Sequence, residues 1–266
     1  MFMRADASNQ ISALSRLALS QPIFGLMQTV PNPSLTELAV WSGYDFVILD
    51  CEHGIVDEPA HIACLQVISG SPAFAAVRLR PGDFGSVGRY LDFGADAILM
   101  ADVQTPEEAA RFAAAATFGP QGTRSSTKST RAARYGLTAI KDIAPPLLLA
   151  TIESKRAVDN VAAIAATPGI GGLILGPSDL SADLNCPFEF SALAYTSAFA
   201  QVEQGAAGAR IHLGTIAHPG YSVERLLSAG HRIIIVTADI AVLREGFGSH
   251  LAAARNQLEK PPGEKP

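Results

Sequence analysis

The sequence has little of what marks a membrane protein, a disulfide-stabilised protein or a nucleic-acid-binding protein. No apolar run approaches the ~18 residues that a membrane-spanning helix needs. Only three cysteines are present, an odd number without metal-knuckle spacing, which favours reduced thiols over a disulfide framework. Lysine and arginine total 20 against 25 acidic residues, so no basic footprint for nucleic acid or an anionic membrane is expected.

For the two ends of the chain we expect no signal peptide at the start and a flexible tail at the end. Residues 1–10 are polar and contain no apolar signal-peptide core. Residues 257–266 are rich in proline and charge and predict a flexible tail. With 266 residues, 48% of them hydrophobic, the chain suits one barrel of roughly 250 residues. We therefore expect a cytoplasmic protein whose residues 1–266 form one domain, with a core over about 21–256.

Short apolar runs alternate with longer alanine-rich segments along the chain. Strands are expected at Ile23–Met27, Phe46–Leu49, Ala75–Leu79, Ala97–Met100, Leu147–Ile152, Gly172–Leu175, Arg210–Gly214 and Ile233–Val236. Helices are expected at Ser34–Trp41, Glu58–Ile68, Gly85–Leu91, Pro106–Ala116, Lys155–Ala166, Phe190–Ala207, Val223–Ser228 and Ala241–Ala254. Eight such alternations predict an α/β fold, a (β/α)₈ TIM barrel. An open doubly wound sheet is the alternative, but no glycine-rich dinucleotide fingerprint follows the first strand.

One polar stretch breaks this rhythm. Residues 118–136 (FGPQGTRSSTKSTRAARYG) follow the fourth of the eight strand–helix units and contain Arg124, Lys128, Arg131 and Arg134. Loops this long in a compact domain are usually functional or mobile. The segment is therefore interpreted either as a lid over an anionic substrate or as a solvated surface loop.

Two carboxylates follow neighbouring predicted strands. Glu153 ends the fifth strand and Asp179 follows the sixth, and the active site of a (β/α)₈ barrel lies at the carboxyl ends of its strands. Without a local cation the two carboxylates would repel each other, and a hard divalent ion would remove this conflict. Each residue alone could instead cap the helix that follows it. Their joint placement favours a metal site.

Two further residues follow strands and could perform acid–base or electrostatic work. His53 lies in an acidic run after the second strand, where Asp50 could orient it as a general base. Arg78 ends the third strand and could stabilise a developing enolate oxygen, with Arg80 as the alternative. No lysine lies within a predicted strand, so an imine mechanism through Lys128 or Lys155 is disfavoured.

From about Ile23 to Leu251 the chain resembles the HpcH/HpaI aldolases, the 4-hydroxy-2-oxoheptanedioate and 2-dehydro-3-deoxyglucarate aldolase family. The matching segments are FVILDCEH (Phe46–His53), Val77–Arg78, YLDFGA (Tyr90–Ala95), Gly122–Arg124, TIES (Thr151–Ser154) and GPSDLSAD (Gly176–Asp183). The resemblance implies a barrel of the phosphoenolpyruvate/pyruvate-domain type and a class II pyruvate aldolase. It also implies that Glu153 and Asp179 bind Mg²⁺, Mn²⁺ or Co²⁺.

The same resemblance assigns further roles. His53 corresponds to the base and Arg78 to the residue that stabilises the enolate, while Asp92 matches an aspartate that raises the basicity of the histidine. Asp92 ends a helix and could reach the site only across a subunit interface, so Asp50 is favoured on local geometry. The family also implies a homo-oligomer, typically a hexamer with exchanged C-terminal helices.

The substrate pocket departs from the family pattern. Thr151 stands where the family has a substrate-contacting glutamine, and Arg124 is followed by two serines instead of Gly-Val. Substrate contacts are expected from Thr151, Arg124 and Asp179, and from N–H groups of Gly176, Pro177 and Ser178 at a helix start. The metal and base positions match the family, so these departures leave the aldehyde, and even the keto acid, open.

These observations predict a metal-dependent aldolase that reversibly cleaves a 4-hydroxy-2-oxo acid to pyruvate and an aldehyde. One alternative is a related lyase that acts on malyl- or citramalyl-CoA, or a decarboxylase of oxaloacetate. A second alternative is a non-catalytic, metal-dependent binder of 2-oxo acids. No nucleic-acid or membrane partner is expected.

Overall fold

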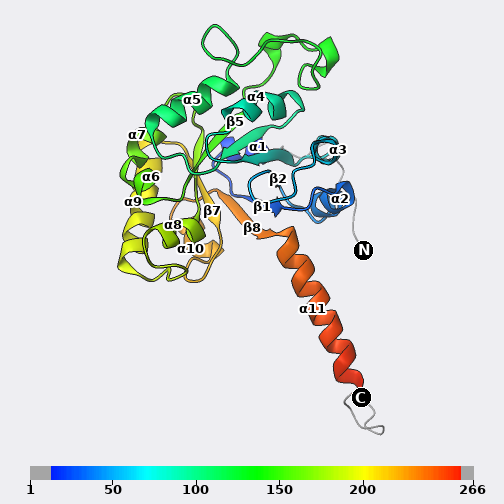
Figure 1. The fold of residues 1–266 in the computed structure, drawn as a ribbon, viewed down its shortest axis with the longest axis vertical. Coiled ribbons are helices and arrows are strands. Elements are labelled where there is room, and N and C mark those ends of the chain that lie inside the picture. The colour runs from blue at the N-terminus through cyan, green and yellow to red at the C-terminus, as the bar shows by residue number, and fades with distance from the viewer. Residues whose placement is uncertain (1–12, 259–266) are drawn as a thin grey trace.

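Eight parallel strands close into one barrel in the computed structural model, which describes residues 13–258 (Figure 1). The strands are β1 (Ile23–Gln28), β2 (Phe46–Asp50), β3 (Phe74–Leu79), β4 (Ala97–Met100), β5 (Leu147–Ile152), β6 (Gly172–Leu175), β7 (His212–Ile216) and β8 (Ile233–Ala238). Because β8 pairs with β1, the open-sheet alternative is excluded and the predicted (β/α)₈ barrel is confirmed. Residues 1–12 and 259–266, with the expectations attached to them, lie outside the described residues.

One helix precedes β1, and the other helices follow the strands and, except for the last one, surround the barrel (Figure 1). They are α1 (Ala13–Ala18), α2 (Pro33–Trp41), α3 (Glu58–Ile68), α4 (Phe84–Asp92), α5 (Pro106–Ala116), α6 (Lys155–Asp159), α7 (Val161–Ala165), α8 (Pro177–Asp183), α9 (Leu193–Ala209), α10 (Val223–Ser228) and α11 (Asp239–Leu258), with 3₁₀ turns η1 (Arg134–Gly136) and η2 (Ile140–Asp142). The expected helices do not include α1, and of α8 only the helix start at Gly176–Ser178 is expected. None of the helices in residues 13–258 is long and apolar enough to cross a membrane.

Several boundaries differ from the sequence prediction, and two of these differences have a clear local reason. The helix expected at Lys155–Ala166 is split into α6 and α7 at Asn160, whose amide donates to the carbonyls of Gln104 and Arg156. Asparagine side chains compete with helical backbone hydrogen bonds in this way. Strand β7 begins two residues late because α9 runs to Ala209 and Arg210 ends it in a left-handed conformation, with φ 58°.

The apolar interior has two layers. The inner layer fills the barrel and consists of Leu17, Ile23, Phe46, Ile48, Phe74, Ala76, Ala97, Leu99, Leu149, Ile174, Ile233 and Ile235. Leu17 comes from α1, so this unpredicted helix contributes to the barrel filling. Gly25 leaves room for the Phe46 ring, since a Cβ at residue 25 would lie 2.0 Å from it. The interior is therefore a packed core and not a channel.

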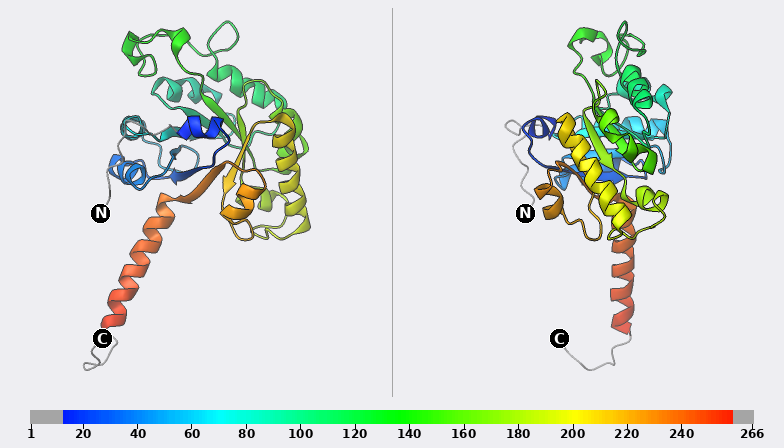
Figure 2. Two further views of the ribbon diagram at one scale, coloured as in Figure 1. Left: turned by 180° about the vertical axis from the view of Figure 1, so that it is seen from behind. Right: turned by 90° about the vertical axis from the view of Figure 1, so that its left-hand side faces the viewer.

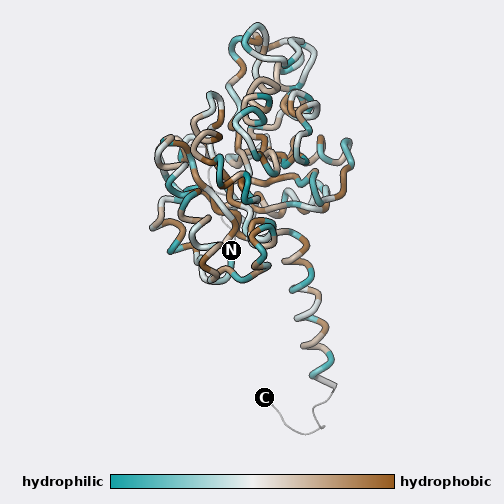
Figure 3. The backbone as a smooth tube through the Cα atoms, turned by 60° about the vertical axis from the view of Figure 1, so that its left-hand side comes forward, coloured by the Kyte–Doolittle hydropathy of each residue, from teal (hydrophilic) through white to brown (hydrophobic). Residues whose placement is uncertain are grey.

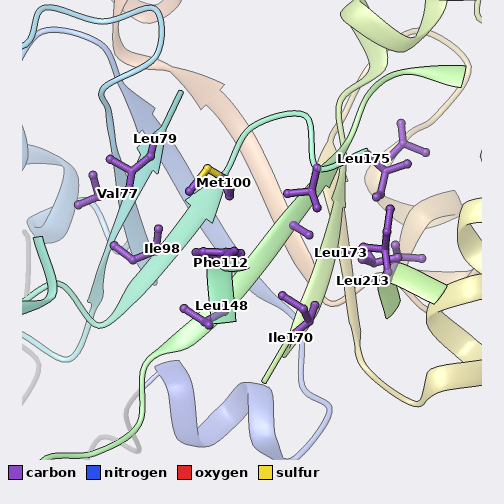
Figure 4. Close-up of a cluster of buried hydrophobic side chains, with 14 of the residues drawn as sticks. Val77, Leu79, Ile98, Met100, Phe112, Leu148, Ile170, Leu173, Leu175 and Leu213 are labelled. Atoms are coloured by element: carbon purple, nitrogen blue, oxygen red, sulfur yellow. The ribbon is translucent and has the colours of Figure 1, made fainter. Parts of the chain in front are cut away.

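The outer layer lies between the strands and the helices. Figure 4 shows part of it, with Val77 and Leu79 of β3, Ile98 and Met100 of β4, and Phe112 of α5 drawn as sticks. The three cysteines, Cys51, Cys64 and Cys186, are buried and unpaired, as the sequence predicts. Because both faces of each strand are buried, the strands are continuous apolar runs in the sequence.

Helix α11 departs from the compact arrangement. It runs away from the barrel instead of packing along it (Figures 1 and 2), and apolar and polar residues alternate along it (Figure 3). Its apolar side chains are solvent-exposed, with Phe247 72% and Leu251 52% accessible. On the barrel, Trp41 of α2 is also 72% exposed. Such apolar surface is characteristic of a protein–protein contact.

Candidate active site

The carboxyl ends of β2 to β6 surround an acidic cavity of about 400 Å³. Its lining residues are Glu52, His53, Pro81, Asp102, Gln104, Glu153, Ser154, Asp179 and Asp183, which we call the carboxylate cavity. The structure thus brings three of the predicted site residues, His53, Glu153 and Asp179, around one space. No residue of 118–136 lines this cavity, so in this chain that loop is not a lid over it.

Glu153 is buried at the end of β5. Its Oε1 accepts the N–H of Asp102 at 2.8 Å, and Gly176 makes room for it, since a Cβ there would lie 2.4 Å from Oε2. Burial, followed by the negative charges of Glu52 and Asp179, raises the pKa of Glu153 to about 8. A carboxylate that burial and like charges disfavour in this way would gain from a nearby cation.

Asp179 lies in the first turn of α8 and is solvent-exposed. Its charge acts on Glu153, so the two residues are within electrostatic reach, as strand order predicts. Residues 13–258 contain no group of three or more His, Cys, Asp or Glu side chains able to hold a metal by themselves. A pair of carboxylates nevertheless fits Mg²⁺ and similar ions, which are usually bound through one or two carboxylates plus water and substrate oxygens. The donor set thus fits a divalent ion that shares its coordination with substrate.

Arg78 is fixed by a two-pronged ion pair with Asp50. The distances are 2.8 Å from Nε to Oδ1 and 2.7 Å from Nη2 to Oδ2, and the Asp50 side chain is fully buried. Burial alone would raise the pKa of Asp50, but the hydrogen bond and charge of Arg78 outweigh it and lower that pKa. Arg78 also approaches Glu52, with 3.2 Å between Nη1 and Oε2. Of the two candidate arginines, Arg78 is the inward one and Arg80 is exposed.

His53 lies at the mouth of the cavity with 65% of its side chain exposed. The carboxylate nearest to its ring is Glu52, 3.8 Å from Nε2. Asp50 accepts the backbone N–H of His53 at 3.2 Å, so it positions this loop and does not contact the ring. The expected pairing of Asp50 with the His53 imidazole is therefore absent, because Arg78 occupies the Asp50 carboxylate.

Asp92 and Arg124 lie elsewhere, beside α4. They pair with each other at 2.6 Å and line a second cavity of about 730 Å³ outside the barrel. Arg89 and Arg131 line it too, and we call it the arginine cavity. Arg131 fastens residues 118–136 to the body by donating to the carbonyl of Phe93 and the hydroxyl of Ser69. Within one chain, Arg124 is thus not part of the carboxylate cavity.

The structure reduces the number of groups that could make the remaining expected substrate contacts. Thr151 lies on β5 two residues before Glu153, and its buried hydroxyl has no hydrogen-bond partner. The N–H of Gly176 donates to the carbonyl of Ile152 at 3.1 Å, and Pro177 has no N–H. Of the residues Gly176 to Ser178, only Ser178 therefore has an N–H group that could bind a substrate carboxylate.

Sequence reasoning missed Pro81 and four polar residues of the cavity wall: Asp102, Gln104, Ser154 and Asp183. Asp102 and Gln104 follow β4, so the rule that strand ends carry the site would have found them. Asp183 ends α8, a helix that the apolar pattern did not reveal. Asp102 has a φ of 40°, an uncommon conformation for a non-glycine residue that lets its N–H reach Glu153.

The chain is similar to known aldolases over most of its length. Residues 24–245 match the family described as HpcH/HpaI aldolase/citrate lyase. A 5-keto-4-deoxy-D-glucarate aldolase of Shigella dysenteriae serotype 1 (strain Sd197) is 32% identical over 234 residues, 86% of this chain and 90% of that protein. Similarity at this level makes the chain a carbon–carbon lyase of the aldolase type.

Solved structures show the same architecture. A HpcH/HpaI aldolase/citrate lyase family protein from Burkholderia cenocepacia J2315 superposes with a TM-score of 0.82 and 29% identity, over 89% of this chain and 95% of that one. The HpcH/HpaI aldolase from Desulfitobacterium hafniense DCB-2 has a TM-score of 0.80 and 23% identity, over 97% and 100%. The second comparison concerns the fold alone.

Proposed function

The chain belongs to the HpcH/HpaI aldolase/citrate lyase family, and we propose that it is a divalent-metal-dependent aldolase that reversibly cleaves a 4-hydroxy-2-oxo acid to pyruvate and an aldehyde. One observation carries this proposal. Glu153, Asp179 and His53 line one cavity, and Arg78 lies against its wall residue Glu52. These groups can hold a cation, move a proton and face a developing negative charge.

Glu153 and Asp179 are the residues that would hold Mg²⁺, Mn²⁺ or Co²⁺. A divalent ion bound there supplies Lewis-acid polarisation of the substrate's 2-oxo group. Glu153 is held for this role by the N–H of Asp102 and by the space that Gly176 leaves. Ser178, in the first turn of α8, offers its N–H to the substrate carboxylate.

His53 and Arg78 divide the remaining work. His53 accepts the proton of the 4-hydroxyl group while the C3–C4 bond breaks and its electron pair moves toward the 2-oxo carbon. Arg78 stabilises the enolate oxygen with a charge that Asp50 holds in place, so little reorganisation is needed. Glu52 is the carboxylate closest to the His53 ring within this chain. Thr151 offers its free hydroxyl to the substrate.

The decisive experiment measures pyruvate release from a 4-hydroxy-2-oxo acid. Turnover should stop in EDTA and return with Mg²⁺, Mn²⁺ or Co²⁺. The His53→Ala variant should lose at least about 100-fold in kcat while its metal affinity stays the same, since general bases contribute 10²–10⁴-fold. His212→Gln, at the opposite end of the barrel, is the matched control. Full turnover of the His53→Ala variant would refute the base assignment, and full turnover in EDTA would refute the metal.

We also propose a homo-oligomer, by resemblance a hexamer, in which α11 packs on a neighbouring copy. The exposed Phe247 on α11 and Trp41 on α2 support this proposal. In such an assembly, Asp92 and Arg124 of one copy could act only on the site of the next. A Phe247→Glu variant should shift the mass measured by light scattering toward the monomer, whereas Ser249→Glu on the same helix should change it less.

The thioester-lyase alternative is disfavoured. Phosphate groups of a CoA substrate need a basic surface, and none of the residues that line the carboxylate cavity is lysine or arginine. The arginines of residues 118–136 that were expected to supply such a surface include Arg124 and Arg131, which line the arginine cavity instead. A small free 2-oxo acid therefore suits the site better. The cytoplasmic location stays a prediction.

A further inference from the structure

We propose that the carboxylate cavity selects an uncharged hydroxyaldehyde as the aldehyde partner, and that Asp102 and Asp183 exclude a carboxylated one. The inference rests on the proposed aldolase function and adds a substrate class to it. The substrate would then carry a carboxylate at its 2-oxo end and hydroxyl groups, without a second carboxylate, at the other end.

The charge on the cavity wall is the first argument. Five lining residues are carboxylates, namely Glu52, Asp102, Glu153, Asp179 and Asp183, and none is lysine or arginine. A divalent ion would offset Glu153 and Asp179, and Arg78 contacts Glu52. The negative charges of Asp102 and Asp183 are left without a balancing cation. Placing two like charges next to each other at a binding site costs free energy, and binding sites use this cost to reject ligands of the wrong charge.

The cations nearest to these two acids are directed away from the cavity. Lys155 donates its backbone N–H to Asp183 at 2.6 Å, but its ammonium group pairs with Asp159 at 2.6 Å. Arg156 reaches the side-chain oxygen of Gln104 at 3.5 Å and not Asp102. Within one chain, the described residues that line the cavity therefore include no lysine or arginine to receive a carboxylate on the aldehyde half.

Asp102 is held rigidly as a hydrogen-bond acceptor. Its Oδ1 accepts the Ser154 hydroxyl at 2.8 Å, and its Oδ2 accepts the Gln104 amide at 2.5 Å. Each carboxylate oxygen can accept a further hydrogen bond. Substrate hydroxyls are donors that match such fixed acceptors, and the arrangement needs no rearrangement on binding.

A second, independent feature is a buried hydroxyl group, that of Thr151. Thr151 is 4% exposed, and its hydroxyl has no hydrogen-bond partner among the described residues. It lies two residues before Glu153 on β5, hence on the same face of the strand. A buried polar group left without a partner is costly, so a bound substrate that supplies one is favoured.

The test uses aldehydes that differ in one group, each added to pyruvate. Beside the aldehyde group, glycolaldehyde carries a hydroxymethyl group and glyoxylate carries a carboxylate. Acetaldehyde carries a methyl group and has no hydroxyl. We expect kcat/KM for glycolaldehyde to exceed that for glyoxylate at least about tenfold, and to exceed that for acetaldehyde. The double variant Asp102→Asn/Asp183→Asn should lower the glycolaldehyde-to-glyoxylate ratio at least about tenfold. Asp142→Asn, which removes an exposed charge outside the cavity wall, should leave the ratio unchanged.

The ratio separates specificity from general damage, because a misfolded or metal-poor variant loses both reactions together. A wild-type preference for glyoxylate, or an unchanged ratio in the double variant, would overturn the inference. Equal use of acetaldehyde and glycolaldehyde would overturn its hydroxyl part. Exchange of the pyruvate methyl protons with deuterium, measured by NMR without any aldehyde, tests the proposed aldolase function separately. Exchange together with a glyoxylate preference would refute the specificity alone, whereas absent exchange would count against the aldolase function.

Discussion

The two cavities of this protein differ in how their charges are neutralised. In the arginine cavity each cation has an anion or carbonyl beside it: Arg89 pairs with Glu58, Arg124 with Asp92, and Arg131 with the carbonyl of Phe93. In the carboxylate cavity the acids outnumber their partners, and Arg78 is the cation that contacts the wall. The smaller cavity is thus the one whose negative charges are not balanced by neighbouring cations. Uncompensated charge, and not volume, distinguishes the candidate active site from the second cavity.

The largest expected effect comes from breaking the buried pair of Arg78 and Asp50. The Arg78→Met variant leaves the Asp50 carboxylate fully buried without its cation, which should lower the free energy of unfolding by about 3–5 kcal/mol. Chemical denaturation would measure it. The double variant Arg78→Met/Asp50→Asn should recover much of this stability but no activity. A double variant as unstable as the single one would show that charge burial is not the cause.

Glu153 should make the metal-free protein sensitive to pH. Its pKa is raised to about 8, so the folded state keeps a proton that the unfolded state loses near the usual pKa of 4.5. In EDTA the free energy of unfolding should therefore fall as pH rises from about 4.5 to about 8. The Glu153→Gln variant should lack this fall and also lose at least about 100-fold in turnover. Thermal melts from pH 5 to pH 8.5 would check both proteins, and parallel curves would contradict the raised pKa.

Gly176 should affect metal binding through Glu153. A Cβ at this position would lie 2.4 Å from Glu153 Oε2, so Gly176→Ala should displace the carboxylate and weaken metal affinity about 10–100-fold. Isothermal titration with Mn²⁺ would measure the change. Gly208→Ala in α9 is the control, because its Cβ would meet nothing within 4 Å. Equal metal affinity in the two variants would show that Glu153 does not depend on this space.

The smallest effect is expected in the arginine cavity. The Arg124→Met variant removes one member of a pair whose Asp92 side chain is 25% exposed, so water can solvate the acid that is left. We expect a loss of about 1–2 kcal/mol in unfolding free energy. Metal affinity should stay within twofold, since Arg124 does not line the carboxylate cavity. A large drop in metal affinity would mean that the two cavities are coupled.

Strand order was predictable because each strand is a continuous apolar run that ends at a polar residue. β4, β5 and β6 begin and end as predicted, and this spacing brings Glu153 and Asp179 to one face of the barrel. The short helix α1 and the extent of α8 were not predictable, since six or seven residues show no clear helical periodicity. Asp183 was missed with α8. The partner of Asp50 could not be settled either, because His53 is near in sequence while Arg78 is near only across the β2–β3 register.

The sequence by itself determined the alternation of strands and helices, the family and the acids that follow the strands, because period, spacing and motif are local properties of the chain. Only the tertiary structure decided which charges meet. It joined Asp50 to Arg78, placed Asp92 with Arg124 outside the barrel, and added Asp102 and Asp183 to the cavity wall. An ion pair depends on distance and on burial together, and both are set only when strands far apart in sequence become neighbours.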